Sequence, residues 1–273
     1  MVRTPAPGGS DRFFDRSPPP PFRRETQDFS WETAYWLCEL SRLIYRLDET
    51  EIGPDAPHPD RNVFLNRVGL HEAFTRRNGS NLCAVMVADA AVHGPFAVLA
   101  FRGTRGFEGW FSNLNTAHTP WPFGGAVHGG FKADFLGLWE ETADALLSLD
   151  LPLCSTGHSL GGALAVLAAS VLLPLAVYSF GAPGDAVFAH GLRRVPVYRL
   201  ELPKDIVPTV PPSVIPFDFD HPGTPVILDP FPPEECPAAQ RRFSNPPEFL
   251  SSHAPVNYTA AIERRLDRRT PVP

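Results

Sequence analysis

Apolar and polar residues follow two different periods along this chain. From Ser30 the apolar residues recur at the spacing of one helix face as far as Leu47, and Ser30 stands where a helix cap is expected. The short apolar runs 82–89 and 96–103 are separated by the turn-forming residues 90–95. The pattern therefore predicts an amphipathic helix followed by two neighbouring strands.

The centre of the chain alternates between strand and helix patterns. Its β-α-β-α-β order predicts an α/β fold with a mostly parallel central sheet flanked by helices. A last strand and a last helix follow a proline-rich stretch. The predicted elements are a helix at 129–150, a strand at 151–157, a helix at 159–173, a strand at 175–181, a short helical connection at 185–194, a strand at 195–202, a strand at 225–228 and a helix at 256–269.

The domain organisation follows from the distribution of proline and aliphatic residues. Residues 1–28 combine proline, glycine and charge with few aliphatic side chains, which predicts a disordered or extended arm. Residues 29–273 are long enough and apolar enough for one large domain with a single core. We therefore expect an arm at 1–28 and one α/β domain at 29–273.

Composition and charge narrow the classes of partner. The net charge is −6 and no basic cluster is present, so we expect no nucleic acid partner. Neither the cysteines nor the carboxylates have metal-ligand spacing, and we expect no metal. The most apolar stretch, 163–177, is too short for a bilayer span and contains Pro174. No signal-peptide pattern is visible, so we expect a cytoplasmic location while leaving secretion open.

The stretch 154–168, CSTGHSLGGALAVLA, carries the clearest chemical signal. Ser159 lies between Gly157 and Gly161, with an apolar strand before it and an apolar helix after it. A serine on such a strained strand-to-helix turn is exposed for reaction, and the helix directs free N–H groups toward a developing oxyanion. The alternative is a passive glycine-rich turn, but the strand and helix context favours a nucleophile.

A nucleophilic serine needs a histidine base and an orienting carboxylate, which follow in the order Ser, Asp or Glu, His in this topology. His158 adjoins Ser159, so we interpret it as a structural residue. Asp205 follows a predicted strand, at the edge of the sheet where α/β folds assemble their sites, although a role in capping a turn fits it equally well. The other candidate, Asp185, has a position typical of a helix cap. The downstream histidines are His190, His221 and His253, of which His253 directly precedes the last helix.

Several motifs in this order resemble the class 3 lipase family of α/β-hydrolases. The resemblance extends over about 30–260, and TGHSLGGALA is its most specific part. The motifs are LAFRGT at 99–104, WFSNL at 110–114, VHGGF at 127–131, TGHSLGGALA at 156–165, YSFGAPGDAVFA at 178–189, KDIVPTVPP at 204–212 and SSHAPVNY at 251–258.

The resemblance implies a role for each of five residues. Ser159 would be the nucleophile, Asp205 the orienting acid and His253 the base, while Thr104 and Leu160 would donate to the oxyanion. It also implies a surface lid in the segment after FRGT; the alternative there is a fixed loop. The lid candidates are Phe107, Trp110 and Phe111.

The resulting prediction is a serine carboxylester hydrolase that works through an acyl-enzyme without a cofactor, most simply a lipase acting on acylglycerols. Its partners would be a small-molecule or lipid ester and, transiently, a lipid surface. An esterase, phospholipase, feruloyl esterase or thioesterase would use the same machinery. A catalytically silent hydrolase fold that binds lipid or protein is the hypothesis from another class.

Overall fold

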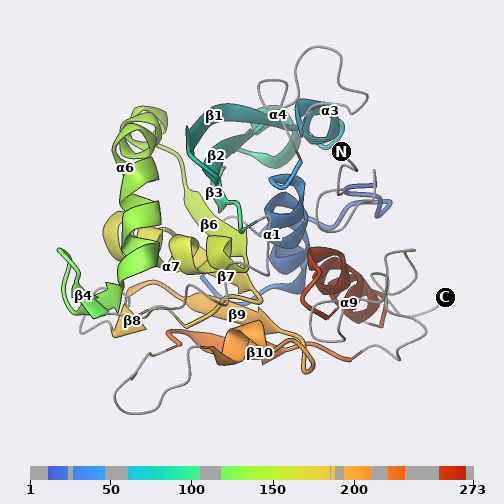
Figure 1. Cartoon of the computed structure of the whole chain (residues 1–273). Helices are drawn as coiled ribbons and strands as arrows, with labels where there is room; N and C mark the ends of the chain where they lie inside the picture. The colour runs from blue at the N-terminus through green and yellow to red at the C-terminus, as the bar shows by residue number, and fades with distance from the viewer. Residues whose placement is uncertain are drawn as a thin grey trace, which may run out of the picture.

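A seven-stranded sheet forms the centre of the molecule in the computed structural model (Figure 1). The structure describes residues 12–23, 27–46, 61–104, 118–184, 186–187, 194–210, 221–230 and 252–268. The strands lie in the order β1-β2-β3-β6-β7-β9-β10. Their bounds are β1 Leu70–Asn78, β2 Asn81–Ala88, β3 Ala97–Phe101, β6 Leu153–His158, β7 Ala176–Phe180, β9 Val197–Glu201 and β10 Thr224–Ile227.

The sheet is mostly parallel, as predicted. Strand β2 pairs antiparallel with both β1 and β3, whereas β3, β6, β7, β9 and β10 pair in parallel. The parallel strands β3, β6, β7 and β9 therefore end at one edge of the sheet. Loops that follow these strands meet at that edge, which is where α/β folds assemble their sites.

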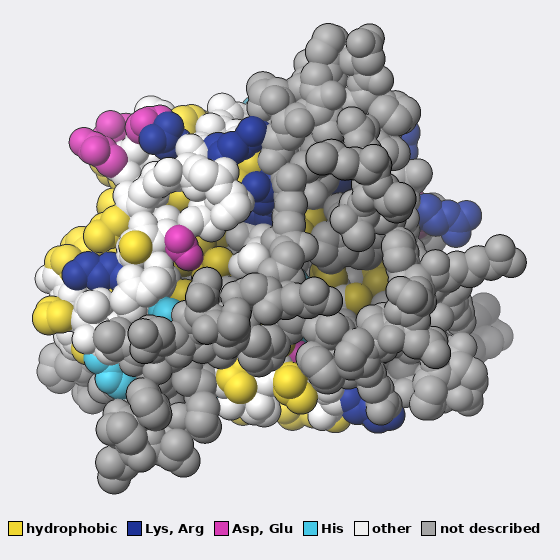
Figure 2. Space-filling view, in the orientation of Figure 1, with side chains coloured by type: hydrophobic (Ala, Val, Ile, Leu, Met, Phe, Trp, Pro, Cys, Tyr) yellow, Lys and Arg dark blue, Asp and Glu magenta, His cyan; other side chains and the backbone are white. Residues whose placement is uncertain are grey.

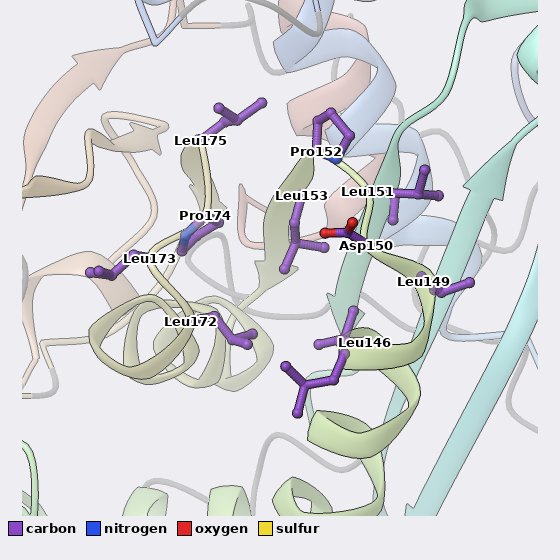
Figure 3. A pocket seen from close by; sticks show the side chains of 12 residues that line it. Leu146, Leu149, Asp150, Leu151, Pro152, Leu153, Leu172, Leu173, Pro174 and Leu175 are labelled. Carbon is purple, nitrogen blue, oxygen red and sulfur yellow. The ribbon is translucent and has the colours of Figure 1, made fainter.

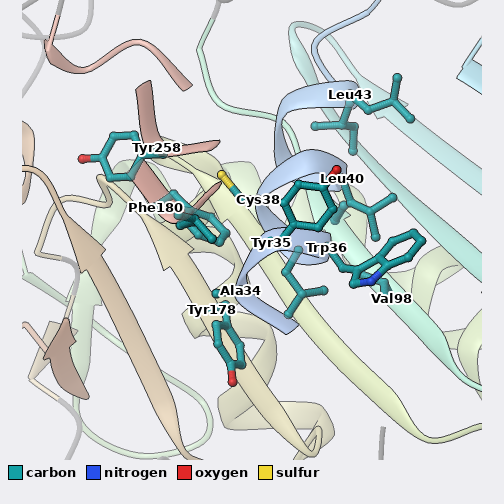
Figure 4. Close-up of a cluster of buried hydrophobic side chains, with 14 of the residues drawn as sticks. Ala34, Tyr35, Trp36, Cys38, Leu40, Leu43, Val98, Tyr178, Phe180 and Tyr258 are labelled. Atoms are coloured by element: carbon teal, nitrogen blue, oxygen red, sulfur yellow. The ribbon is translucent and has the colours of Figure 1, made fainter. Parts of the chain in front are cut away.

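Helices cover both faces of this sheet (Figure 1). The helices α1, Trp31–Leu43, and α9, Pro255–Asp267, share one buried cluster with the sheet, and α6, Gly129–Leu149, and α7, Leu160–Leu172, share the other. Figure 4 shows side chains of the first cluster, to which α1 contributes Tyr35 and Trp36, β7 contributes Tyr178 and α9 contributes Tyr258.

Strand β3 shows why a strand that is buried on both faces has an unbroken run of apolar residues in the sequence. All five of its residues are buried. Val98 and Ala100 belong to the cluster under α1 and α9, whereas the other three belong to the cluster under α6 and α7. Successive side chains point to opposite faces, and both faces are covered here. The same sheet thus supports both helix layers.

Helix α9 is held against α1 by a buried polar group as well as by apolar contacts. Glu39 of α1 is 1% exposed and accepts hydrogen bonds from Thr259 Oγ1 at 2.8 Å and from the Phe14 N–H at 2.7 Å. Arg42 donates to the same carboxylate at 2.7 Å. A buried carboxylate is stable only with donors of this kind. The hydrogen bond from Thr259 holds α9 against α1, and with it the start of α9, which His253 precedes.

Most predicted elements have their counterparts in the structure, with shifts of a few residues at their ends. Ser30 caps α1 by accepting from the Thr33 N–H. The prediction of a helical connection at 185–194 is wrong where the structure describes it, because Ala186–Val187 form strand β8. The antiparallel β8 pairing with β5 explains this, since a sheet partner decides a short ambiguous segment.

Several short elements of the structure were not predicted. They are the helices α3, Arg61–Asn66, and α4, Ala90–His93, a 3-10 turn at Val207–Thr209, and the strands β4, His118–Pro120, and β5, Ala126–His128. Strands β4, β5 and β8 form a second sheet. Strand β1 was not predicted either, because only its first residue is buried and its sequence does not alternate between apolar and polar residues.

Part of the predicted arm packs against the domain. Residues 12–23 contain neither helix nor strand, yet Phe13 and Phe14 are buried and Phe22 stacks on Phe96 at 4.1 Å between ring centroids. Phe13 and Phe14 belong to the same buried cluster as α1. The boundary between an arm at 1–28 and a domain at 29–273 stays a prediction.

The described surface mixes side chains of all kinds. On the face in Figure 2, the described basic side chains are scattered among acidic, apolar and neutral ones. Among the described residues, no helix is both long and apolar enough to cross a bilayer.

Candidate active site

Ser159 occupies a strained turn between β6 and α7. Its backbone has φ 58° and ψ −133°, a conformation that residues other than glycine rarely adopt. Such strain costs about 1–3 kcal/mol and persists only where the surroundings enforce it. The Ser159 N–H donates to the Phe180 carbonyl at 2.9 Å, which ties the turn to the end of β7.

Two glycines make this turn sterically feasible. A Cβ atom on Gly157 would lie 2.2 Å from the backbone of Gly161, and one on Gly161 would lie 2.2 Å from the Phe101 carbonyl. No side chain fits at either position without moving backbone. The glycine spacing that marked the sequence motif therefore follows from the close approach of β6, α7 and the end of β3.

Asp205 and His253 form a buried hydrogen-bonded pair. His253 Nδ1 lies 2.7 Å from Asp205 Oδ2, and the two side chains are 6% and 0% exposed. Asp205 follows β9 in the loop at the carboxyl edge of the sheet, and His253 precedes α9. A carboxylate oxygen can only accept here, so the pair assigns the proton to Nδ1. His253 Nε2 is then the ring atom available as a base.

Asp205 accepts two further hydrogen bonds. The Val207 N–H donates to Oδ1 at 2.9 Å, and the Tyr258 hydroxyl donates to Oδ2 at 2.5 Å. Burial, together with the negative charge of Asp205, holds the pKa of Tyr258 well above its usual value. Tyr258 thus stays protonated as a donor. With His253, three donors thus bind the oxygens of this buried carboxylate, as a buried polar group requires.

The pair lies against the same strand ends as the serine turn. Gly181, with φ 58°, follows Phe180 at the end of β7, and a Cβ there would lie 2.8 Å from Asp205 Oδ2 and 3.1 Å from His253 Cε1. The rings of His253 and His158 are 4.5 Å apart between centroids. Three segments predicted to carry the site thus converge on one edge of the sheet.

The two predicted oxyanion donors flank the serine turn. Leu160 is buried and is the first residue of α7, where a backbone N–H has no partner within the helix. Thr104 is partly buried and follows the end of β3 by three residues. A Cβ on the preceding Gly103 would lie 2.6 Å from the His158 carbonyl, so this loop contacts the serine turn. Their role as oxyanion donors stays a prediction.

The lid candidates Phe107, Trp110 and Phe111 lie outside the described residues, so the lid also stays a prediction. Sequence reasoning missed Tyr258 and Gly181, although both stand in quoted motifs. A hydroxyl five residues beyond a candidate base was the available signal for Tyr258. Within the described parts of the chain, no three metal-binding side chains gather.

A cavity of about 360 Å³ opens at the opposite edge of the sheet (Figure 3). It lies between the ends of α6 and α7 and the first residues of β6 and β7, and leucines such as Leu146, Leu153 and Leu172 line it. Ser159 follows the other end of β6. This cavity is therefore separate from the candidate active site.

Comparison with known proteins agrees with the motifs and the geometry. Residues 98–215 match the family model described as Lipase (class 3). The secreted mono- and diacylglycerol lipase 1 of Fusarium solani is 31% identical over an alignment of 151 residues, which covers 48% of this chain and 44% of that protein. A lipase of Rhizomucor miehei is 31% identical over 46% of this chain and 39% of that protein.

The fold is shared with solved lipases. The structure of the Rhizomucor miehei triacylglyceride lipase aligns with a TM-score of 0.57 and 26% identity, covering 72% of this chain and 78% of that one. The α/β-hydrolase fold is therefore confirmed. Residues 98–215 are thus similar to the class 3 lipase family, the family that the motifs resemble.

The chain spans less than half the length of either of these two relatives. The prediction of a cytoplasmic location is wrong, because the Fusarium solani relative is by name a secreted enzyme.

Replacing Tyr258 by phenylalanine tests the support of Asp205. Tyr258→Phe removes one donor from the carboxylate, and a hydrogen bond to a charged group contributes about 1.5–3 kcal/mol. We expect ester hydrolysis with a kcat lowered about 10-fold and an unchanged KM, because the hydroxyl lies behind Asp205. Steady-state kinetics on a soluble ester measures both constants.

Tyr178→Phe is the matched control, since that buried hydroxyl contacts the Ser30 N–H at 3.0 Å, outside the site. It should lower stability without lowering kcat. An unchanged kcat in Tyr258→Phe would contradict the assigned role.

Proposed function

We propose that this protein is a serine carboxylester hydrolase of the lipase type, acting on acylglycerols through a Ser159–His253–Asp205 triad. The observation that carries the proposal is the buried Asp205–His253 pair beside a strained serine turn. Structural roles explain neither feature well. Apolar side chains could fill the space of a buried histidine and carboxylate, and glycine would adopt the backbone conformation of Ser159 without its strain.

In the proposed mechanism, His253 Nε2 takes the proton of the Ser159 hydroxyl as Oγ attacks the acyl carbonyl. Asp205 stabilises the imidazolium that forms. The N–H groups of Leu160 and Thr104 hold the oxyanion of the tetrahedral intermediate, and each such donor contributes about 3–4 kcal/mol at the barrier. His253 then protonates the leaving alcohol.

The second half of the reaction repeats the first with water. His253 takes a proton from a water molecule, which attacks the acyl group on Ser159, and the proton returns to Ser159 as the acid leaves. The three donors to Asp205 support this role, because they hold the carboxylate in place and with it the hydrogen bond to Nδ1.

The substrate class rests on the relatives. The Fusarium solani relative is named a mono- and diacylglycerol lipase, and the Rhizomucor miehei structure is that of a triacylglyceride lipase. Acylglycerols are therefore the first substrates to test. The triad would serve other esters as well, and the walls of the acyl site select among them.

Substitution of Ser159 is the direct test of the function. Ser159→Ala should lower kcat for p-nitrophenyl butyrate and tributyrin on the order of 10⁴-fold or more, since the acyl-enzyme can no longer form. A fluorophosphonate probe should label the wild-type protein at Ser159 and leave the variant unlabelled.

Ser155→Ala is the matched control, because Ser155 is a buried serine on β6, the strand that leads into the Ser159 turn. It should keep both activity and labelling. Full hydrolysis by Ser159→Ala would refute the proposed function.

A series of glycerol esters tests the lipase assignment. We expect the rate of hydrolysis to rise sharply once a medium-chain triacylglycerol exceeds its solubility, because a lipase gains activity at an interface. The rate should be measured by titration of released acid below and above that concentration. Saturation below the solubility limit, without a further rise, would instead identify an esterase for soluble substrates.

A further inference from the structure

His158, the residue before the candidate nucleophile, has partners on both ring nitrogens. It is the last residue of β6 and is 2% exposed. Its Nε2 lies 2.7 Å from the backbone carbonyl of His253, and its Nδ1 lies 2.9 Å from the Tyr45 hydroxyl. Tyr45 follows α1 and is 2% exposed. One side chain thus connects the serine turn with two other segments.

The chemistry of these partners assigns the protons. A carbonyl oxygen can only accept, so His158 Nε2 carries the hydrogen and donates to His253. Burial, and secondarily the neighbouring His253, hold the pKa of His158 well below its usual value, which keeps the ring neutral. Nδ1 is then unprotonated and accepts the hydrogen of the Tyr45 hydroxyl. A second acceptor of that hydroxyl, the His158 carbonyl, is farther away at 3.4 Å.

Tyr45 extends the connection to the loop after β3. Its hydroxyl oxygen lies against Gly103, the residue before Thr104, and a Cβ on Gly103 would overlap this oxygen, so only glycine allows the approach. Burial raises the pKa of Tyr45, so the phenol keeps its proton for His158. The hydrogen bonds run in one direction, from Tyr45 through His158 to His253.

We infer that His158 and Tyr45 are positioning residues, which hold the backbone of the base His253 and the loop of Thr104 in register with Ser159. This inference rests on the proposed function and adds to it. Asp205 fixes the His253 ring at Nδ1, whereas His158 fixes the His253 main chain at its carbonyl. His253 is therefore held at two points, its ring and its main chain, and neither His158 nor Tyr45 is a group that contacts the substrate.

The benefit of such a connection is geometric. Proton transfer from Ser159 needs Nε2 of His253 within hydrogen-bonding distance, and misplacement by about 1 Å costs roughly 10²-fold in rate. His253 lies on a short segment before α9, 95 residues from His158 in the sequence. A direct bond between them couples the position of the base to that of the nucleophile.

Two substitutions at His158 separate hydrogen bonding from packing. His158→Phe keeps the ring volume and removes both hydrogen bonds, so we expect kcat for p-nitrophenyl butyrate to fall about 10- to 100-fold with KM nearly unchanged. His158→Gln restores an amide donor for the His253 carbonyl and should recover most of that loss. Tyr45→Phe should cause a smaller fall in kcat than His158→Phe.

His93→Phe is the matched control. Its Nε2 contacts the Val68 carbonyl at 2.6 Å, the same kind of bond at a distance from the site, and its loss should leave kcat unchanged. A folded His158→Phe variant with the wild-type kcat would overturn the inference, and so would equal losses in the phenylalanine and glutamine variants. If Ser159→Ala hydrolyses the ester fully, it is the proposed function that fails.

A measurement on the unsubstituted protein covers the case in which His158→Phe does not fold. Long-range ¹H–¹⁵N NMR correlations report which nitrogen of each histidine carries the proton. We expect one histidine, assigned to His158 by its absence in His158→Gln, to remain neutral with its proton on Nε2 from pH about 5 to about 8. A proton on Nδ1, or an imidazolium within this range, would contradict the inference.

Discussion

The hydrogen bond between Asp205 and His253 is the interaction on which the candidate site depends. It joins two loops that lie 48 residues apart, and both side chains are almost completely buried. A buried carboxylate is stable only with several donors, and Tyr258 and Val207 provide two of them. The bond therefore requires that β9, its following loop and the start of α9 be held together accurately.

The fold meets this requirement by placing parallel strand ends side by side. The Ser159 turn follows β6, Gly181 follows β7 and Asp205 follows β9, and these strands are neighbours in the sheet. Glycines at the points of closest approach let these segments touch. The α1–α9 contact, with buried Glu39 at its centre, fixes the helix that carries Tyr258. The packing of the domain thus determines the geometry of the site.

The sequence predicted the parts of this site that depend on local pattern. Ser159 was recognisable because a glycine-flanked serine stood between an apolar strand and an apolar helix. Asp205 and His253 followed from chain order and from a family resemblance, and the structure brings these two together. The roles of Tyr258 and Tyr45 were missed, because their hydrogen bonds span 53 and 113 residues. Such contacts exist only once the sheet has formed.

The difference between local pattern and long-range contact also explains which elements of the fold were predicted wrongly. Strong apolar periods predicted the central strands and the four long helices, whereas β1 has mostly exposed or half-buried positions and no clear alternation. The segment 186–187 carries a helix-compatible pattern, but pairing with β5 makes it a strand. Tertiary partners decide such short or polar segments. The location was misjudged because the prediction relied on the chain's own N-terminal pattern.

A crystal structure of the protein inactivated by an alkyl phosphonate ester tests the central claim most directly. The account predicts phosphorus bonded to Ser159 Oγ, its phosphoryl oxygen accepting from the N–H groups of Leu160 and Thr104, and His253 Nε2 about 3 Å from Oγ or the ester oxygen. Phosphorus on another residue, or His253 Nε2 turned away from Ser159 while still paired with Asp205, would contradict it.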